Sequence, residues 1–258
     1  MARAELDLAA AKKKVVSFIR SRTERAGADG AVLGLSGGID SAVTAYLTVE
    51  ALGSGRVTAL IMPDFRVTPE TDVSDAGEVA EELCVETRVI DIAPIHRAFT
   101  KGLARDRLAE GNLRARIRMA LLYYYANSSN RIVIGTGDRS EALLGYFTKY
   151  GDGGVDILPI GDLYKTEVKK MGEILGISRR IISKRSSPRL WPGQTAEGEL
   201  GMGYDAIDDV LRLHVNRKMS VRETAAMVGI NTEEVRTIAS RVERTAHKRA
   251  TPEICKVH

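Results

Sequence analysis

The first half of the chain alternates between two hydrophobic patterns. Residues 5–26, 40–52, 69–83 and 112–127 carry apolar side chains at a helical spacing. Short apolar runs at 31–35, 56–62, 86–90 and 131–135 have the length and composition of buried strands. Strands that alternate with helices pair in parallel through right-handed crossovers, so the pattern predicts an α/β fold: a doubly wound, mostly parallel sheet flanked by helices.

The pattern changes after Gly145. Residues 146–164 are rich in glycine, aspartate and aromatic residues, and residues 184–203 contain two prolines and four glycines. Loops of this length in a compact domain usually serve a function. We therefore expect a single domain over 1–258, made of an N-terminal helix (1–30), an α/β core (31–183), an active-site loop (184–203) and a helical C-terminal region (204–258, with 204–246 helical throughout).

Composition and charge limit the kind of protein. The chain has 258 residues, of which 44% are apolar and 28% charged, and no apolar run approaches the ~20 residues of a membrane span. The N-terminus lacks an apolar signal core, and two cysteines without paired spacing exclude a cysteine-based metal cluster. We expect a cytoplasmic protein with no membrane partner. The net charge of +4 does not by itself predict nucleic-acid binding, and it suits an anionic nucleotide.

The first candidate site follows the strand at 31–35, which runs into Ser36-Gly-Gly-Ile-Asp-Ser41 just as a helix begins. Glycines let the backbone approach a ligand, and a helix start offers unpaired N–H groups to an anion. The segment therefore predicts a pyrophosphate cradle rather than an ordinary helix cap. A carboxylate beside phosphate requires a cation between them, so we interpret Asp40 as a Mg²⁺ ligand. The lysine-containing P-loop and the G-x-G-x-x-G fingerprint are both absent from the sequence.

A second set of polar residues follows the strand at 131–135. Thr136 lies at its carboxyl end, the edge where such sheets bind ligands, and Glu141 lies one helical turn further on, where it could give the metal a second carboxylate. The segment from Gly145 to Asp156 combines aromatic, lysine and aspartate side chains, as expected for binding a flat, charged heterocycle. Lys165, at the start of another helix, is placed to meet a triphosphate.

These motifs carry a family resemblance. The hexapeptide resembles the PP-loop of the N-type ATP pyrophosphatases, and residues 135–167 resemble the signature of the NAD synthetases. The likeness extends through Asn112–Met119, Leu190-Trp-Pro-Gly-Gln-Thr and His247-Lys-Arg249, from about residue 30 to about residue 250. It implies a Rossmann-like fold of the adenine nucleotide alpha hydrolase type, with 31–183 as the nucleotide-binding core. It also implies a homodimer that consumes ATP with Mg²⁺ and amidates deamido-NAD to NAD.

The resemblance also implies roles for particular residues. The ATP-binding set is Gly34, Leu35, Ser36, Gly37, Gly38, Ile39, Asp40, Ser41, Thr136, Lys165 and Ser187. The deamido-NAD-binding set is Arg116, Lys149, Asp156, His247 and Lys248, and the metal ligands are Asp40 and Glu141. Two segments depart from the family pattern, Ser186-Ser-Pro-Arg-Leu190 and Thr195-Ala-Glu197. No residue is assigned as a general base.

Three further expectations bear on function. Glutamine-using relatives carry a fused amidase domain, and since the resemblance begins by about residue 30, we expect the nitrogen source to be free ammonia or ammonia from a separate partner. The alternatives are another PP-loop amidating ligase, such as a GMP synthetase subunit, and a regulator with a DNA-binding helix-turn-helix at 219–244. Glu233 and Glu234, which would repel phosphates, argue against the regulator and against a nucleic-acid partner. Arg114 and Arg118 are expected on a solvated helix face.

Overall fold

The computed structural model describes residues 6–257 and contains a four-stranded parallel sheet. The strands are β1 (Gly30–Gly34), β2 (Val57–Ile61), β3 (Glu86–Val89) and β4 (Arg131–Ile134), in the order β3-β2-β1-β4. Ala31 of the central strand pairs with Val57 on one side and Ile132 on the other. The doubly wound parallel sheet predicted from the sequence is thereby confirmed, with every predicted strand within two residues of its observed bounds.

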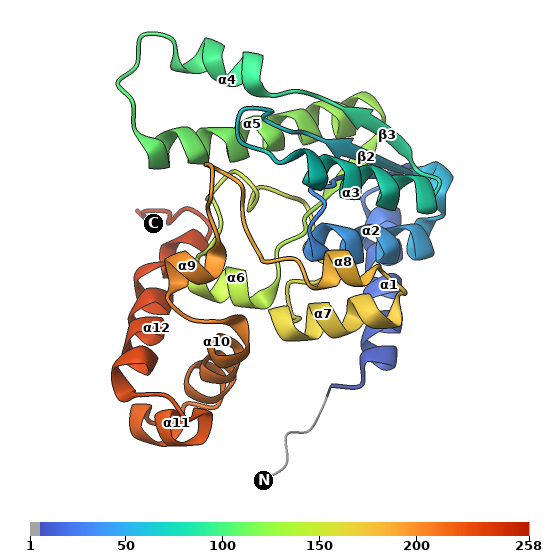
Figure 1. Ribbon diagram of the computed structural model, residues 1–258. Coiled ribbons are helices and arrows are strands. Elements are labelled where there is room, and N and C mark those ends of the chain that lie inside the picture. Colours follow the sequence, from blue (N-terminus) through green and yellow to red (C-terminus); the bar gives the residue numbers. More distant parts are fainter. Residues whose placement is uncertain (1–5, 258) are drawn as a thin grey trace.

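Helices cover both faces of this sheet (Figure 1). The flanking helices are α1 (Leu8–Arg25), α2 (Ile39–Leu52), α3 (Glu70–Glu82), α4 (Ala93–Thr100), α5 (Arg107–Ser128) and α7 (Lys165–Ile174), with a short 3₁₀ helix at Ser54–Arg56. Successive strand residues point to opposite faces, so Ala31 and Leu33 join the core under α1, α2 and α7. Val32 and Val133 join a second core under α4 and α5. The first residue of the predicted helix 5–26 lies outside the described residues.

The C-terminal half builds a separate helical core. Its elements are α6 (Arg139–Leu144), α9 (Ala196–Leu200), α10 (Tyr204–Val210), a π-helical segment (Leu211–Asn216), α11 (Val221–Val228), α12 (Thr232–Arg244) and a 3₁₀ turn, η3 (Ala246–Lys248). Leu144, Tyr204, Ile207, Val235 and Ile238 pack together there. Most of this group lies at the opposite end of the molecule from α4 and β3 in Figure 1. The short helix α8 (Arg179–Ile182) instead packs through Ile181 into the core under α1, α2 and α7.

The prediction that 204–246 is helical throughout was wrong in detail. The region divides into four helical segments, and residues 217–220 and 229–231 leave the helical conformation. Gly229 ends α11 with a left-handed φ of +78°, a conformation that glycine adopts without strain. Within residues 6–257, no helix is long and apolar enough to cross a membrane.

Candidate active site

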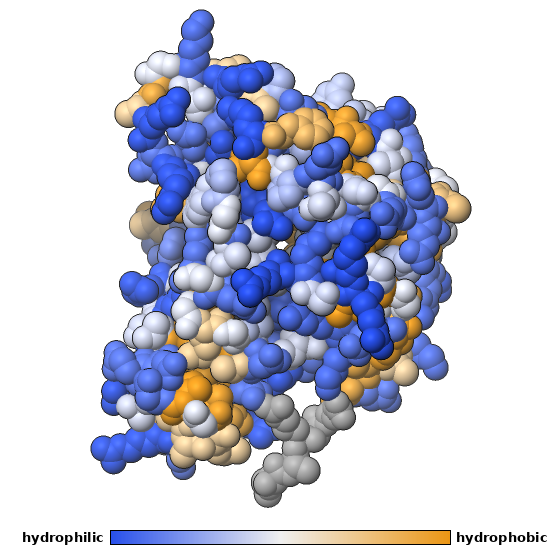
Figure 2. Space-filling view, in the orientation of Figure 1, coloured by the Kyte–Doolittle hydropathy of each residue, from blue (hydrophilic) through white to orange (hydrophobic). Residues whose placement is uncertain are grey.

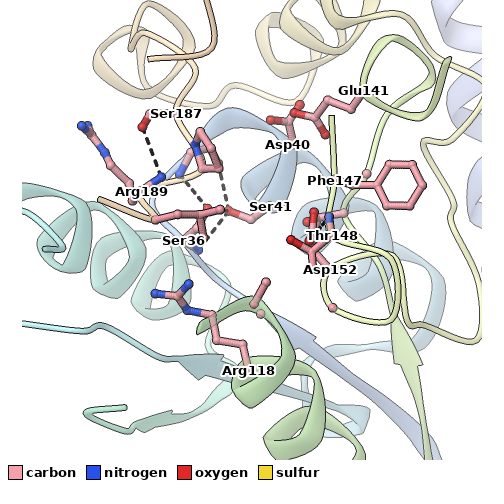
Figure 3. Close-up of a pocket in the computed structure, with 18 of the residues that line it drawn as sticks. Ser36, Asp40, Ser41, Arg118, Glu141, Phe147, Thr148, Asp152, Ser187 and Arg189 are labelled. Carbon is pink, nitrogen blue, oxygen red and sulfur yellow. Dashed lines mark hydrogen bonds between the residues drawn. The ribbon is translucent and has the colours of Figure 1, made fainter. Parts of the chain in front are cut away.

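A cavity of about 410 Å³ lies at the carboxyl ends of the strands. Its walls come from the ends of β1, β2 and β4, from the segment after α6, and from the 184–203 loop, whose Ser187 and Arg189 are drawn in Figure 3. Open α/β sheets bind their ligands at this edge. Nine of the eleven predicted ATP-binding residues line the cavity; Gly37 lies behind the turn and Lys165 is buried beneath it.

The phosphate loop joins β1 to α2 and is held by its own serines. Ser41 Oγ lies 3.0 Å from Ser36 Oγ and donates to the carbonyl of Gly38 at 2.9 Å. Gly38 is the N-cap of α2 and gives that helix no side-chain cap, so the first N–H groups of α2 remain available to an anion. Gly37 has a φ of +74°, and a Cβ at this position would lie 2.1 Å from the carbonyl oxygen of Asp72. The turn therefore requires glycine.

Lys165 brings three carboxylates together below the phosphate loop. Its Nζ is fully buried and lies 2.7 Å from Asp40, 2.9 Å from Asp138 and 2.9 Å from Glu141. Burial alone would lower the pKa of Lys165, but the surrounding carboxylates raise the pKa well above its ordinary value. Burial in turn raises the pKa of Asp138 and of Glu141, against the opposing effect of Lys165. In Figure 3 the carboxylates of Asp40 and Glu141 point toward each other.

This cluster has the donor chemistry of a partial cation site. Its carboxylates outnumber the one ammonium group, and Asp40 Oδ1 and Asp138 Oδ2 are buried and, within residues 6–257, have the ammonium of Lys165 as their partner, at 2.7 and 2.9 Å. Within the described part of the chain, no three acidic, histidine or cysteine side chains form a complete metal site. Mg²⁺ typically takes one or two carboxylates and completes its shell with phosphate oxygens and water. The residues therefore fit Mg²⁺ that arrives together with a nucleotide.

The 184–203 loop is anchored to the first turn of α3. Lys184 Nζ donates to the carbonyl of Gly37 at 2.8 Å and contacts Asp72 and Asp75, while Arg189 Nε donates to Asp72 at 2.7 Å. Arg189 holds a left-handed φ of +51° in the segment that departs from the family pattern. Ser187 donates to the carbonyl of Gln194 at 2.6 Å and accepts from the N–H of Arg189. Asp72 thus ties the loop to the phosphate-binding turn.

The residues predicted to bind deamido-NAD lie around the segment 145–156. Arg116 donates to the carbonyl of Lys149, and Lys149 Nζ donates to the carbonyl of His247 at 2.9 Å. Asp156 accepts from the N–H of Val133 at 2.7 Å and from the hydroxyl of Tyr123. Among the five, only Lys248 lines the cavity. The structure therefore gathers this set on an adjacent surface, and its role toward a dinucleotide stays a prediction.

Arg114 and Arg118 do not lie on a solvated face, contrary to the sequence prediction. Arg114 is buried, and its Nε donates to the fully buried Asp64 at 2.8 Å. Arg118 donates to the carbonyl of Met62 at 2.9 Å and lines the cavity, and burial lowers its pKa to about 10. In the sequence the two arginines share one helical stripe with Gly111 and Ala115, but two charged residues in that stripe do not mark it as buried.

Other cavity residues were missed by the sequence analysis. Trp191 of the 184–203 loop lies 5.0 Å from the guanidinium of Arg107 and packs on Gly111, where a Cβ would lie 3.2 Å from the indole. Phe147, Thr148 and Asp152 line the opposite wall, with Asp152 accepting from the N–H of Thr148 at 2.8 Å. Trp191 lies in a motif that carries the family resemblance, but no role was assigned to it, because the residues that it contacts are distant in sequence. The loop around Asp152 was noted as a whole, without assignment of this residue.

The fold and the site together define a class of protein. A parallel sheet whose first strand enters a Ser-Gly-Gly-Ile-Asp-Ser turn, with carboxylates beside the helix start, is the architecture of a PP-loop nucleotide-binding protein. The family model for NAD synthase matches residues 11–252, and the chain belongs to this family.

The individual relatives agree with this assignment. The NH3-dependent NAD(+) synthetase of Methanosarcina acetivorans is 48% identical over 98% of this chain and 100% of its own length. Among solved structures, an NMN synthetase from Francisella tularensis is 36% identical with a TM-score of 0.86, over 97% of this chain and 99% of that one. An NH3-dependent NAD synthetase from Campylobacter jejuni, bound to nitrate, is 33% identical with a TM-score of 0.83, over 98% and 100%.

Proposed function

We propose that the chain is an ammonia-dependent ligase that forms a C–N bond by amidating deamido-NAD to NAD, with ATP as co-substrate and AMP and pyrophosphate as products. The observation that carries the proposal is the phosphate loop lying directly beside the Asp40–Glu141 carboxylates at the carboxyl edge of the sheet. The near full-length similarity to a relative described as NH3-dependent supports free ammonia as the nitrogen source.

The reaction has two steps. An oxygen of the nicotinate carboxylate attacks the α-phosphorus of ATP, the bond between the α-phosphorus and the bridging oxygen breaks, and pyrophosphate leaves. Ammonia then attacks the acyl carbon of the adenylate, the acyl C–O bond breaks, AMP leaves, and the nitrogen loses a proton. We propose that the serines and N–H groups of 36–41 hold the pyrophosphate end, with Thr136 and Ser187 on the nucleotide. Catalysis here is positioning and electrostatic stabilisation.

Magnesium has a defined place in this proposal. Asp40 and Glu141 would hold Mg²⁺ beside the phosphates, where it would offset the charge that develops on the departing pyrophosphate. Lys165 keeps these two carboxylates close together through contacts of 2.7 and 2.9 Å. We propose that its ammonium shares them with the cation and reaches the triphosphate from below.

The acyl adenylate must be kept from water. Leu190 and Trp191 close one side of the cavity over Gly111, and Phe147 lies on another wall. Such closure excludes water and strengthens the electrostatic interactions inside the site. We propose that the dinucleotide acid binds beside Phe147 and the Arg116–Lys149 surface.

The substrate is tested by comparing three acids. The purified protein is incubated with ATP, Mg²⁺ and ammonium, together with deamido-NAD, nicotinate mononucleotide or xanthosine monophosphate, and the nucleotides are separated by chromatography. We expect AMP, pyrophosphate and NAD in the first reaction only. Turnover of the mononucleotide alone would indicate an NMN synthetase, as the Francisella relative is named. AMP formed only with xanthosine monophosphate would indicate the GMP synthetase alternative. ADP and orthophosphate would contradict the mechanism.

The metal role is tested at Asp40. Because Asp40 contributes a carboxylate next to the phosphate loop, Asp40→Ala should reduce kcat by about 100-fold or more while the protein still folds. Turnover at several Mg²⁺ concentrations and the melting temperature are measured together. Glu78→Ala is the matched control, since Glu78 pairs with Arg180 on the surface. Wild-type turnover in Asp40→Ala would remove the role that we give to this residue.

We also propose that the protein is a cytoplasmic homodimer. Three apolar side chains on or next to the connection between α4 and α5 are strongly exposed, Phe99 at 61%, Leu103 at 66% and Leu108 at 63%. Exposed apolar groups of this kind often mark a protein interface. On the face shown in Figure 2, apolar side chains form separate groups on a mainly hydrophilic surface. The cytoplasmic location follows from the proposed substrates, because ATP and a pyridine dinucleotide are metabolites of the cell interior.

A further inference from the structure

Three basic side chains near the C-terminus bind the backbone of a segment about a hundred residues earlier. Arg249 Nη1 donates to the carbonyls of Ala142 and Leu143, at 3.1 and 2.7 Å. Arg241 Nε donates to the carbonyl of Leu144 at 3.1 Å, and Lys248 Nζ donates to those of Gly145 and Phe147. We call these three residues the C-terminal clamp. Together they satisfy five carbonyls between residues 142 and 147.

The clamped carbonyls belong largely to the end of α6. This helix has six residues, and an isolated helix of that length is unstable in water because so few hydrogen bonds follow its costly first turn. The carbonyl of Ala142 accepts from the N–H of Gly145 at 3.2 Å, whereas those of Leu143 and Leu144 lie at the end of the helix, where carbonyls lack partners within the helix. Cationic donors at a helix C-terminus both satisfy such carbonyls and oppose the helix dipole. The chain then turns through Gly145, at a φ of +62°, where a Cβ would lie 2.3 Å from Thr245.

Helix α6 carries the carboxylates of the candidate active site at its other end. Asp138 is its N-cap, accepting from the N–H of Glu141 at 2.8 Å, and Glu141 lies in its first turn. Phe147, the last residue of the clamped segment, and Thr148 directly after it line the cavity. The position of both elements therefore depends on how firmly the carbonyls of 142–147 are held.

We propose that Arg249, assisted by Arg241, is a positioning residue for the reaction. Its guanidinium fixes the carboxyl end of α6 and thereby places the carboxylate of Glu141 beside Asp40 and the phosphate loop. A second guanidinium nitrogen donates to the carbonyl of Val242 at 2.7 Å, so Arg249 joins α6 to the end of α12. All of these contacts go to protein backbone, and none needs a bound ligand. The effect of Arg249 on turnover rests on the proposed function, whereas its effect on the position of α6 does not.

The test compares Arg249→Gln with Arg249→Lys. Amide hydrogen exchange is followed over 139–147 in the ligand-free protein, and kcat is measured with ATP, deamido-NAD and ammonium. In Arg249→Gln we expect exchange over 139–147 to rise about tenfold, which is the effect of losing roughly one charge-assisted hydrogen bond. We expect kcat to fall about 100-fold, as for a displaced catalytic group. The lysine variant should restore part of both.

The control is Arg244→Gln, because Arg244 is exposed at the end of α12, near Arg241, and its side chain makes no hydrogen bond or ion pair with any described residue. Exchange in β1 and β2 separates local loosening from general unfolding, and Arg241→Gln serves if the Arg249 variants fold poorly. Unchanged exchange over 139–147 in Arg249→Gln overturns the clamp, whatever the activity. Raised exchange with wild-type kcat overturns the positioning role. An inactive wild-type protein would refute the proposed function and leave the exchange result interpretable.

Discussion

Single buried charges decide much of the geometry around the cavity. Asp64 follows β2, is fully buried, and accepts from Arg66 and Arg114. Burial alone would raise the pKa of this carboxyl, but the hydrogen bonds from the two arginines lower it well below its ordinary value. Removing one partner of such a buried pair usually costs about 3–5 kcal/mol, because the remaining charge is left uncompensated. Asp64 thus fixes the chain just after Met62 and Pro63, which line the cavity.

His96 of α4 belongs to the same cluster and makes folding sensitive to acid. Its Nδ1 lies 3.1 Å from Arg66 and its Nε2 lies 3.3 Å from the carbonyl of Glu110. The ring is buried, and burial together with Arg114 lowers the pKa of His96 below its ordinary value of 6.5, although Asp64 opposes the shift. The unfolded chain therefore binds a proton at a higher pH than the folded protein does. The free energy of unfolding should fall as pH drops below about 6.5.

This prediction is tested by urea unfolding of wild type and His96→Gln at about pH 8 and about pH 5.5. In the variant the free energy of unfolding should depend less steeply on pH than in wild type. The two slopes should differ by at most about 1.4 kcal/mol per pH unit, the limit for a single titrating group. His247→Gln is the matched control, because His247 is exposed. An identical pH dependence in wild type and His96→Gln would show that His96 does not contribute.

At this scale the sequence predicted some residues and not others. Asp40 and Glu141 could be placed, because each follows a recognisable strand end and the two ends are adjacent in a parallel sheet. Arg114 and Arg118 were misplaced, because charged side chains on a helix are usually solvated. Their burial depends on Asp64 and the Met62 carbonyl, which lie fifty or more residues earlier in the chain.

At the scale of elements, the 184–203 loop is held by charge. Asp72 is buried and contacts both Lys184 and Arg189, and Asp75 contacts Lys184. A loop that is ordered before its ligand arrives spares the ligand the free-energy cost of ordering it. The acidic first turn of α3 therefore holds the cations of the 184–203 loop in place before a ligand arrives.

Asp72→Asn removes this charge and keeps the shape of the side chain. We expect the KM for ATP to rise about tenfold, because the competent loop conformation becomes less populated, while kcat changes less. Initial rates at varied ATP concentrations measure both. Glu78→Gln, which alters only the exposed pair with Arg180, is the control and should match wild type. Arg189→Gln should act in the same direction and not additively with Asp72→Asn. A fall in the KM for ATP would contradict the idea that the pair prepares the loop.

The elements missed by the sequence analysis are those made by packing. Helix α4 has eight residues with Pro94 in its first turn, too short for a clear period, and it is held by the burial of Ala93 and His96. The helix-turn-helix spacing at 219–244 does correspond to α11 and α12. However, α12 buries Val235, Ile238 and Val242 in the C-terminal core, and Glu233 and Glu234 form its first turn. The pair is a packing unit of the kind that often shares this spacing.

At the scale of the whole molecule, the candidate active site lies where two separately packed regions meet. The sheet contributes the phosphate loop, and the C-terminal core contributes helix α6 with the residues that hold it. The sequence predicted the sheet, because its periodic pattern is local. It did not predict the joining contacts, such as Arg249 with Ala142, because these depend on tertiary proximity across 107 residues. Only the family resemblance connected those segments in advance.

The homodimer that we propose can be tested at the exposed apolar side chains beside α5. Phe99 and Leu103 expose most of their apolar surface beside α5, the helix that also carries Arg116. A charge introduced there would be costly to bury in an interface but harmless on a free surface. Phe99→Asp and Leu103→Asp should therefore shift the protein to monomer in sedimentation equilibrium. The control is Leu6→Asp, because Leu6 is exposed but lies outside this surface.

If the dinucleotide binds near the interface, the KM for deamido-NAD should rise in the same variants while the KM for ATP changes little. Variants that remain dimeric would exclude this surface, and a wild-type monomer with full turnover would exclude the dimer itself.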